Sequence, residues 1–256
     1  MNLYEAIFVR KTVRHFTTDE VSGEIRDKIR SFYSELPGMS DAYRTKIELV
    51  DNRVRGTLLY HPGPVKCPYY IAFYTADQPR SHMNAGCLMQ QVALYLCTLG
   101  LGTCMFAGIG QHGPAQEKDG LSLAGVLAFG YAKGQVTRQR YEARRLPLEK
   151  LCVIKEKPSP DYMKLLEAAR LAPSVLNTQP WRFVVNGNRI HFFTKKHDAE
   201  KLERHRNEEL NFGMMFANFL VAAEELWIDA DLIRLENISQ KNFPHNRYIL
   251  SALLQR

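Results

Sequence analysis

The sequence contains no arrangement of cysteines or histidines that would predict a bound metal ion. Its five cysteines form no CxxC pair, and its eight histidines show no paired spacing typical of metal ligands. An odd number of cysteines, several of them inside apolar segments, is typical of free thiols in a reducing compartment. We therefore expect no metal site and cysteines that fill small spaces in the core.

Long apolar runs are also lacking. No stretch approaches the about 20 residues that a membrane-spanning helix needs. The first residues include Glu5, Arg10 and Lys11 and no apolar run, so no signal peptide is predicted. The chain of 256 residues is 45% hydrophobic and 24% charged, which fits an ordinary globular protein. Together with the free thiols, these features predict a cytoplasmic protein with no membrane association.

The net charge of +7 is not organised as it is in nucleic-acid-binding proteins. Basic residues are scattered, with local groups only at 138–145, 195–196 and 201–206. No aromatic-studded basic strand or recognition helix accompanies them. We therefore expect no nucleic-acid partner, and an anionic small molecule is a simpler reason for a few positive charges.

The two halves of the chain show the same order of expected elements. Apolar segments begin at Asn84 and Asn211, 127 residues apart, with the sequences NAGCLM and NFGMMF. Each follows a short β-rich run (69–75 and 190–194), which is preceded by a further strand candidate and an amphipathic helix. The letters agree at only two of six positions, so the shared order of elements is what indicates a duplication.

Periodicity and turn residues place the elements of the first half. A capping-box spacing from Thr17 to Glu20 predicts the start of a helix that Pro37 and Gly38 end. Strands are expected at 46–50, 69–75 and 124–131, and a helix at 80–99.

In the second half, Ser159 and Pro160 are typical of a helix start, and Pro173 would end that helix. Strands are expected at 182–185, 190–194 and 248–254. The helix expected at 208–227 is apolar over too wide a face for the surface, which predicts burial against a partner element.

Two motifs can carry chemistry. Residues 10–14 (RKTVR) offer cations and a hydroxyl, and arginine can bind a phosphate through two parallel hydrogen bonds. Residues 172–181 (APSVLNTQPW) form a helix stop followed by a tight turn, which can present amides and hydroxyls to a flat ligand. Taken alone, the first motif is more typical of a solvated surface, and the second is more typical of a helix–strand connector with a buried tryptophan.

These motifs resemble two signatures of the FMN-dependent nitroreductase family, in which they normally lie tens of residues apart. Here roughly 150 residues separate them. In the family's homodimers the second motif lies against flavin that is bound mainly by the other subunit. The resemblance therefore implies an α+β protein with a nitroreductase-like three-layer α/β/α sandwich, built as a single-chain pseudo-dimer of two closely packed tandem halves, 1–154 and 155–256.

The resemblance also implies which residues bind the cofactor FMN. The Gly108 amide would face flavin N5, and Arg144, or alternatively Arg145, would close on the phosphate unless this pair belongs to a solvated basic loop. Many family members have glutamate where this chain has Ala107, which puts the positioning of a nicotinamide in doubt. The full set is Arg10, Lys11, Thr12, Arg14, Ala107, Gly108, Arg144, Arg145, Pro173, Ser174, Val175 and Asn177.

Each motif occurs once. Residues 36–40 keep little beyond the helix stop of the second motif, and residues 155–158 offer little of the first. We therefore expect one FMN per chain and a monomer, because the usual dimer surface would be used internally.

The expected activity is that of an FMN-dependent NAD(P)H oxidoreductase acting on nitroaromatic, quinone or similar electron-poor acceptors. Solvent could supply protons, so no catalytic side chain is named, and the loops at 108–120 and 198–209 are expected to shape the acceptor site. A non-catalytic flavin- or ligand-binding descendant of this fold is the alternative, and a specialised flavoenzyme is a third possibility.

Overall fold

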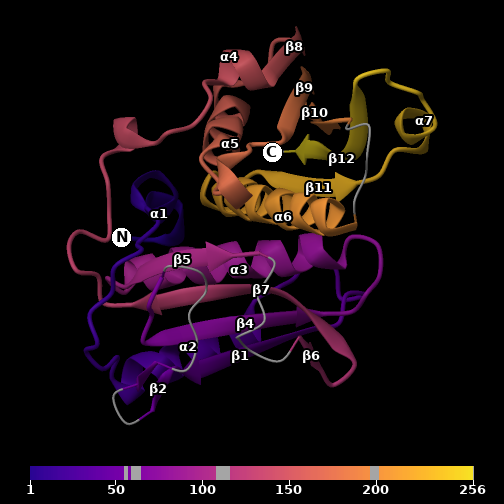
Figure 1. Cartoon of the computed structure of the whole chain (residues 1–256). Helices are drawn as coiled ribbons and strands as arrows, with labels where there is room; N and C mark the ends of the chain where they lie inside the picture. The colour runs from indigo at the N-terminus through magenta and orange to yellow at the C-terminus, as the bar shows by residue number, and fades with distance from the viewer. Residues whose placement is uncertain (55–56, 59–64, 108–115, 197–201, 256) are drawn as a thin grey trace.

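The computed structural model describes residues 1–54, 57–58, 65–107, 116–196 and 202–255. Its two five-stranded sheets enclose a pair of long helices, α3 (Ser81–Thr98) and α6 (Leu202–Glu225), as Figure 1 shows. The α+β class expected from the sequence is confirmed. Within the described residues, no helix is both long and apolar enough to cross a membrane, and no group of three or more His, Cys, Asp or Glu side chains could hold a metal ion.

The first sheet is antiparallel. Its order is β1 (Thr45–Asp51), β4 (Tyr69–Thr75), β7 (Leu121–Gly130) and β5 (Gly102–Phe106), with β6 (Glu117–Lys118) also paired to β7. Every residue of β4 is buried, as an interior strand with covered faces requires. Helix α2 (Gly23–Glu35) packs on α3 beside this sheet.

The second sheet contains one strand from the middle of the chain. Its order is β11 (Asp229–Ile233), β12 (Asn246–Gln255), β10 (Arg189–Lys195), β9 (Trp181–Asn186) and β8 (Cys152–Glu156). The β8–β9 pair is parallel and the others are antiparallel. Strand β8 lies across the expected boundary between residues 154 and 155, and it ties the segment that follows the first sheet to the second sheet.

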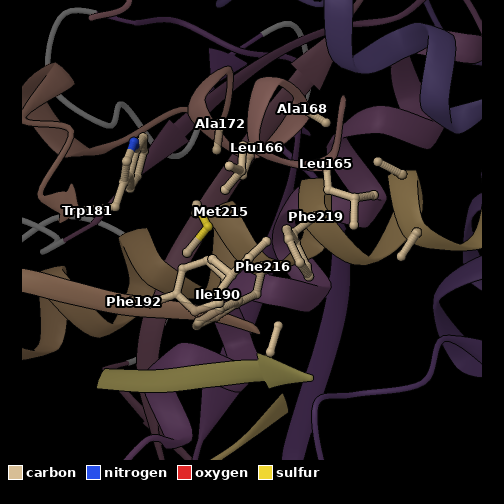
Figure 2. Close-up of a cluster of buried hydrophobic side chains, with 14 of the residues drawn as sticks. Leu165, Leu166, Ala168, Ala172, Trp181, Ile190, Phe192, Met215, Phe216 and Phe219 are labelled. Carbon is tan, nitrogen blue, oxygen red and sulfur yellow. The ribbon is translucent and has the colours of Figure 1, made fainter. Parts of the chain in front are cut away.

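The core of the second half lies between its sheet and helices α5 (Pro160–Arg170) and α6. Figure 2 shows Phe192 of β10 facing Phe216 and Phe219 of α6, and the ring centroids are 4.9 and 5.5 Å apart. Both pairs meet edge to face, the arrangement that the quadrupoles of aromatic rings favour. Trp181, at the start of β9, is fully buried in this core, as is Ala172.

Helices α3 and α6 approach each other closely at two glycines. A Cβ atom on Gly86 would lie 2.2 Å from the Leu210 carbonyl oxygen, and one on Gly213 would lie 1.9 Å from that of Met83. No side chain fits either space, so glycine is required for the crossing. Helix α3 is therefore the partner element against which the apolar pattern of α6 predicted burial.

Corresponding asparagines make corresponding hydrogen bonds in the two halves. The Asn84 side-chain oxygen accepts from the Met39 amide at 2.7 Å. The Asn211 side-chain oxygen accepts from the Val175 amide at 2.8 Å. In each half, an asparagine of the central helix holds the segment after a proline helix stop, in agreement with the duplication hypothesis.

The expected strands β1, β4, β7, β9, β10 and β12 and the expected helices α3 and α5 are present with small shifts at their ends. Helix α6 begins at Leu202, six residues before the expected start. The predicted capping box at Thr17 was wrong, because α2 is capped by Ser22, whose hydroxyl accepts from the Ile25 amide at 3.3 Å. The Val21 amide instead donates to the Tyr69 hydroxyl at 3.2 Å, which holds Val21 outside the helix.

The sequence reading missed the short elements. Helix α1 (Leu3–Val9) begins with a capping box formed by Asn2 and Glu5. The other missed elements are β2 (Arg53–Val54), β3 (Thr57–Leu58), β5, β6, β8, β11, α4 (Leu148–Leu151), α7 (Glu236–Ser239) and two single 3₁₀ turns (Arg140–Glu142 and Val175–Asn177).

Candidate functional site

The two motifs meet at a cavity of about 750 Å³ between the halves of the chain. Every predicted site residue except Gly108 lines it, and Gly108 lies outside the described residues. The described lining is Arg10, Lys11, Thr12, Arg14, Cys104, Met105, Phe106, Ala107, Arg138, Glu142, Ala143, Arg144, Arg145, Pro173, Ser174, Val175, Leu176, Asn177, Leu210 and Met214.

Backbone pairing fixes the N-terminal motif against the first sheet. Thr12 forms a bridge with Thr103, and the Val13 amide donates to the Thr103 carbonyl at 2.8 Å. Arg10 bridges to Thr137 on its other side. The motif is therefore an extended segment beside β5, and its side chains are presented at defined positions.

Arg10 is a buried cation. Only 6% of it is exposed, and Nη1 donates to the Thr103 hydroxyl at 3.3 Å. Burial lowers the pKa of Arg10 to about 10. The guanidinium still carries its charge at neutral pH, and the desolvated cation gains strongly from an anion placed beside it.

Arg145 clamps the basic segment onto the turn. Its Nε donates to the Ala172 carbonyl and its Nη1 to the Asn177 side-chain oxygen, both at 2.9 Å. Asn177 in return donates to the Arg144 carbonyl at 3.1 Å. Burial, and then the charges of Arg10 and Arg138, lower the pKa of Arg145 to about 10.

The turn itself has an unusual backbone. Leu176, Asn177 and Gln179 have φ values of +52°, +56° and +47°. Asparagine adopts this left-handed region readily, but for Leu176 and Gln179 it costs about 1 kcal/mol each. Backbone strain of this kind is concentrated at binding and catalytic sites.

Three hydrogen bonds hold the strained turn: one to α6, one within the turn and one to Leu146, which follows the basic segment. The Asn211 side-chain oxygen accepts from the Val175 amide, and the Ser174 hydroxyl accepts from the Gln179 amide at 3.0 Å. The Gln179 side-chain oxygen accepts from the Leu146 amide at 2.7 Å. The turn and the basic segment therefore form one interlocked unit.

The cavity is strongly positive. Its only carboxylate among the described lining residues is that of Glu142, which accepts from the Gln139 amide at 2.6 Å. Six cations face this single acid: Arg10, Lys11, Arg14, Arg138, Arg144 and Arg145. This donor set fits a phosphate, for which guanidinium groups provide paired donors.

Sequence reasoning missed Arg138, Leu210 and Met214 as lining residues. Arg138 lies in a basic group that the sequence shows, but its burial depends on the fold: its Nη1 donates to the Phe8 carbonyl at 2.8 Å, from the unexpected helix α1. Leu210 and Met214 lie on α6, and they add apolar side chains to the cavity lining. A cavity lined by both cations and apolar side chains suits a flat, phosphate-bearing cofactor such as FMN.

The mixed helices and sheets and the cationic cavity agree with the nitroreductase-like fold that the two motifs led us to expect. The family model described as "Putative TM nitroreductase" matches residues 2–210, and the chain belongs to this family. No curated protein matches the sequence.

One of the similar solved structures supports the fold. A "putative nitroreductase" from Thermotoga maritima is 20% identical, with a TM-score of 0.64 over 99% of this chain and 94% of that chain. An FMN-dependent nitroreductase from Clostridium difficile R20291 is 12% identical, with a TM-score of 0.45 over 57% and 98% of the two chains. An iodotyrosine deiodinase bound to FMN and 3-iodo-L-tyrosine is 18% identical, with a TM-score of 0.40 over 52% and 91%.

Proposed function

We propose that this protein is an FMN-dependent oxidoreductase of the nitroreductase type, which uses NAD(P)H and reduces nitroaromatic, quinone or similar electron-poor acceptors. The observation that carries the proposal is the cavity in which six cations from the first half face the strained turn of the second half. Family membership supports oxidoreductase chemistry, and the donor set supports FMN.

The chain's own residues would bind and orient the cofactor. Arg10, Lys11 and Arg144 would hold the phosphate and the negative edge of the flavin, and the turn at 173–177 would lie against its ring system. Bound FMN would supply the redox chemistry, exchanging electrons with the nicotinamide and then with the acceptor. Among the described lining residues Glu142 is the only carboxylic acid and there is no histidine, so water is the proposed proton source.

We propose one FMN per chain, in a monomer that originated by duplication. A cavity of about 490 Å³ lies beside Asn84, the counterpart of Asn211. Its described lining contains one cation, Lys46, and that lysine is paired with Asp119. This region lacks the excess positive charge that supports phosphate binding in the first cavity. A cytoplasmic location is proposed from the five free cysteines.

The test is an absorption spectrum of the purified protein after FMN is added and the excess removed. We expect a retained flavin spectrum at one FMN per chain, bleached anaerobically by NADH or NADPH and restored by a quinone or nitroaromatic. No retained flavin would overturn the proposal, and two per chain would overturn the single site.

A non-catalytic flavin-binding protein is a second candidate. The observation that favours it is Ala107 in the cavity lining, at the position where the family resemblance leads us to expect a glutamate. Flavin that is retained but is not reduced by either nicotinamide would support this alternative.

A further inference from the structure

Another cavity, of about 690 Å³ (the second cavity), borders the strained turn, as does the 750 Å³ cavity lined by the two motifs (the first cavity). It shares Val175 and Leu176 with the first cavity. Leu176 is 92% exposed and is held out by its left-handed backbone. An apolar side chain is therefore presented to solvent where the two cavities adjoin, positioned to be covered by a ligand that reaches both.

The second cavity also carries positive charge. Its described lining contains the cations Arg182, Lys195 and Arg204 and one carboxylate, that of Glu208. Arg182 is half-buried, and its Nη1 donates to the carbonyls of Gln179 at 3.1 Å and Trp181 at 2.6 Å. These bonds fix the guanidinium beside the turn, whereas Lys195 stands exposed at the end of β10.

Glu208 does not cancel this positive charge, because its carboxylate already has an ion-pair partner and a hydrogen-bond donor. The Thr194 hydroxyl donates to its Oε2 at 2.7 Å, and Arg247 forms an ion pair with its Oε1. Arg247 is not among the described lining residues. The charge of Glu208 is therefore paired with a cation outside the described lining, and the three cations of the lining make the field inside the cavity positive.

We infer that the second cavity binds the anionic end of the electron acceptor, and that the preferred acceptor is an aromatic compound bearing a carboxylate. Val175, Leu176 and Pro180 would contact the ring, while Arg182 and Lys195 would attract the carboxylate. The identity of this ligand as an acceptor rests on the proposed function, but the selection of an anion depends only on the charges of this cavity.

The test compares 4-nitrobenzoate with 4-nitrobenzamide, which has similar size but no charge. Each is titrated by calorimetry into the full-length, FMN-saturated protein, so that the first cavity is filled. The variants are Lys195→Gln and Arg182→Gln. The matched control is Lys196→Gln, which removes an equal charge one residue further on; Lys196 donates to Asn242 at 2.9 Å and is not among the described lining residues.

We expect the carboxylate to bind about tenfold more tightly than the amide, and each lining variant to lose about threefold in affinity for the carboxylate alone. Lys196→Gln should leave both affinities unchanged. Equal affinity for the two probes, or equal effects of Lys195→Gln and Lys196→Gln, would overturn the inference. Because Arg182 could also support the turn, Lys195→Gln is the decisive variant.

Failure of the proposed function would have a different signature. If the protein retains no FMN, or if the flavin is never reduced, the proposed activity falls. The comparison of the Lys195 and Lys196 variants still decides whether the second cavity selects an anion, since neither lysine is among the described lining residues of the first cavity.

Discussion

At the scale of single residues, the neighbouring arginines 144 and 145 have different tasks. Arg144 is exposed and lines the first cavity, whereas Arg145 donates hydrogen bonds to the Ala172 carbonyl and the Asn177 side chain. Arg144→Gln should therefore weaken FMN binding about tenfold with little change in stability, because it removes a charge-assisted contact to phosphate. FMN affinity is measured by quenching of flavin fluorescence, and stability by urea unfolding of the FMN-free protein.

Arg145→Gln should weaken FMN binding and also destabilise the FMN-free protein by about 1–3 kcal/mol, because the Ala172 carbonyl and the Asn177 side chain lose their donor. Arg140→Gln is the control for both variants, since Arg140 stacks over Phe8 and is not among the described cavity residues. The division of tasks would be contradicted if Arg144→Gln lowered stability as much as Arg145→Gln does.

At the scale of elements, the α3–α6 contact depends on two glycines that no propensity argument favours inside a helix. Gly213→Ala would place a methyl group 1.9 Å from the Met83 carbonyl oxygen, so the helices must separate. We expect a loss of about 3 kcal/mol or more in the free energy of unfolding. In the matched variant Gly23→Ala, the new methyl meets nothing within 4 Å at the start of α2, and the change should be small or favourable. Similar losses in the two variants would show that the crossing is not tightly packed.

Some helices and strands could be predicted from the sequence and others could not. Helix α5 was predicted because its capping residues and its apolar periodicity agree, and α3 and β4 were predicted because each is an apolar run. Strands β5 and β8 were missed because they are short and acquire their partners only from β7 and β9, far away in the sequence. The false capping box at Thr17 shows the limit of a local motif, since a hydrogen bond from Val21 to Tyr69 decides where α2 begins.

The candidate site was more predictable than the fold around it. Its motifs are local runs of sequence that line the first cavity together, and the resemblance to a family indicated that they should meet. Arg138 was not found because a carbonyl of α1, which was not predicted, holds it in place. Met214 was not found because the apolar pattern of α6 does not show which of its residues reach the cavity. The second cavity was equally hidden: Arg182 and Lys195 are unremarkable basic residues in the sequence, and only the β9–β10 pairing and the start of α6 bring them together.

At the scale of the whole molecule, the central helices and β8 join the halves so closely that we expect them to unfold together in a monomer of 29.4 kDa. The chain provides separate reporters: both tryptophans, Trp181 and Trp227, lie in the second half, and the buried thiols of Cys67 and Cys87 lie in the first. Tryptophan fluorescence and pulsed thiol labelling should give the same urea midpoint, because separating the halves would expose the α3–α6 interface. Saturating FMN should raise both midpoints equally, since its proposed site draws on both halves. Light scattering checks the mass, and two distinct midpoints would contradict this account by showing that each half folds on its own.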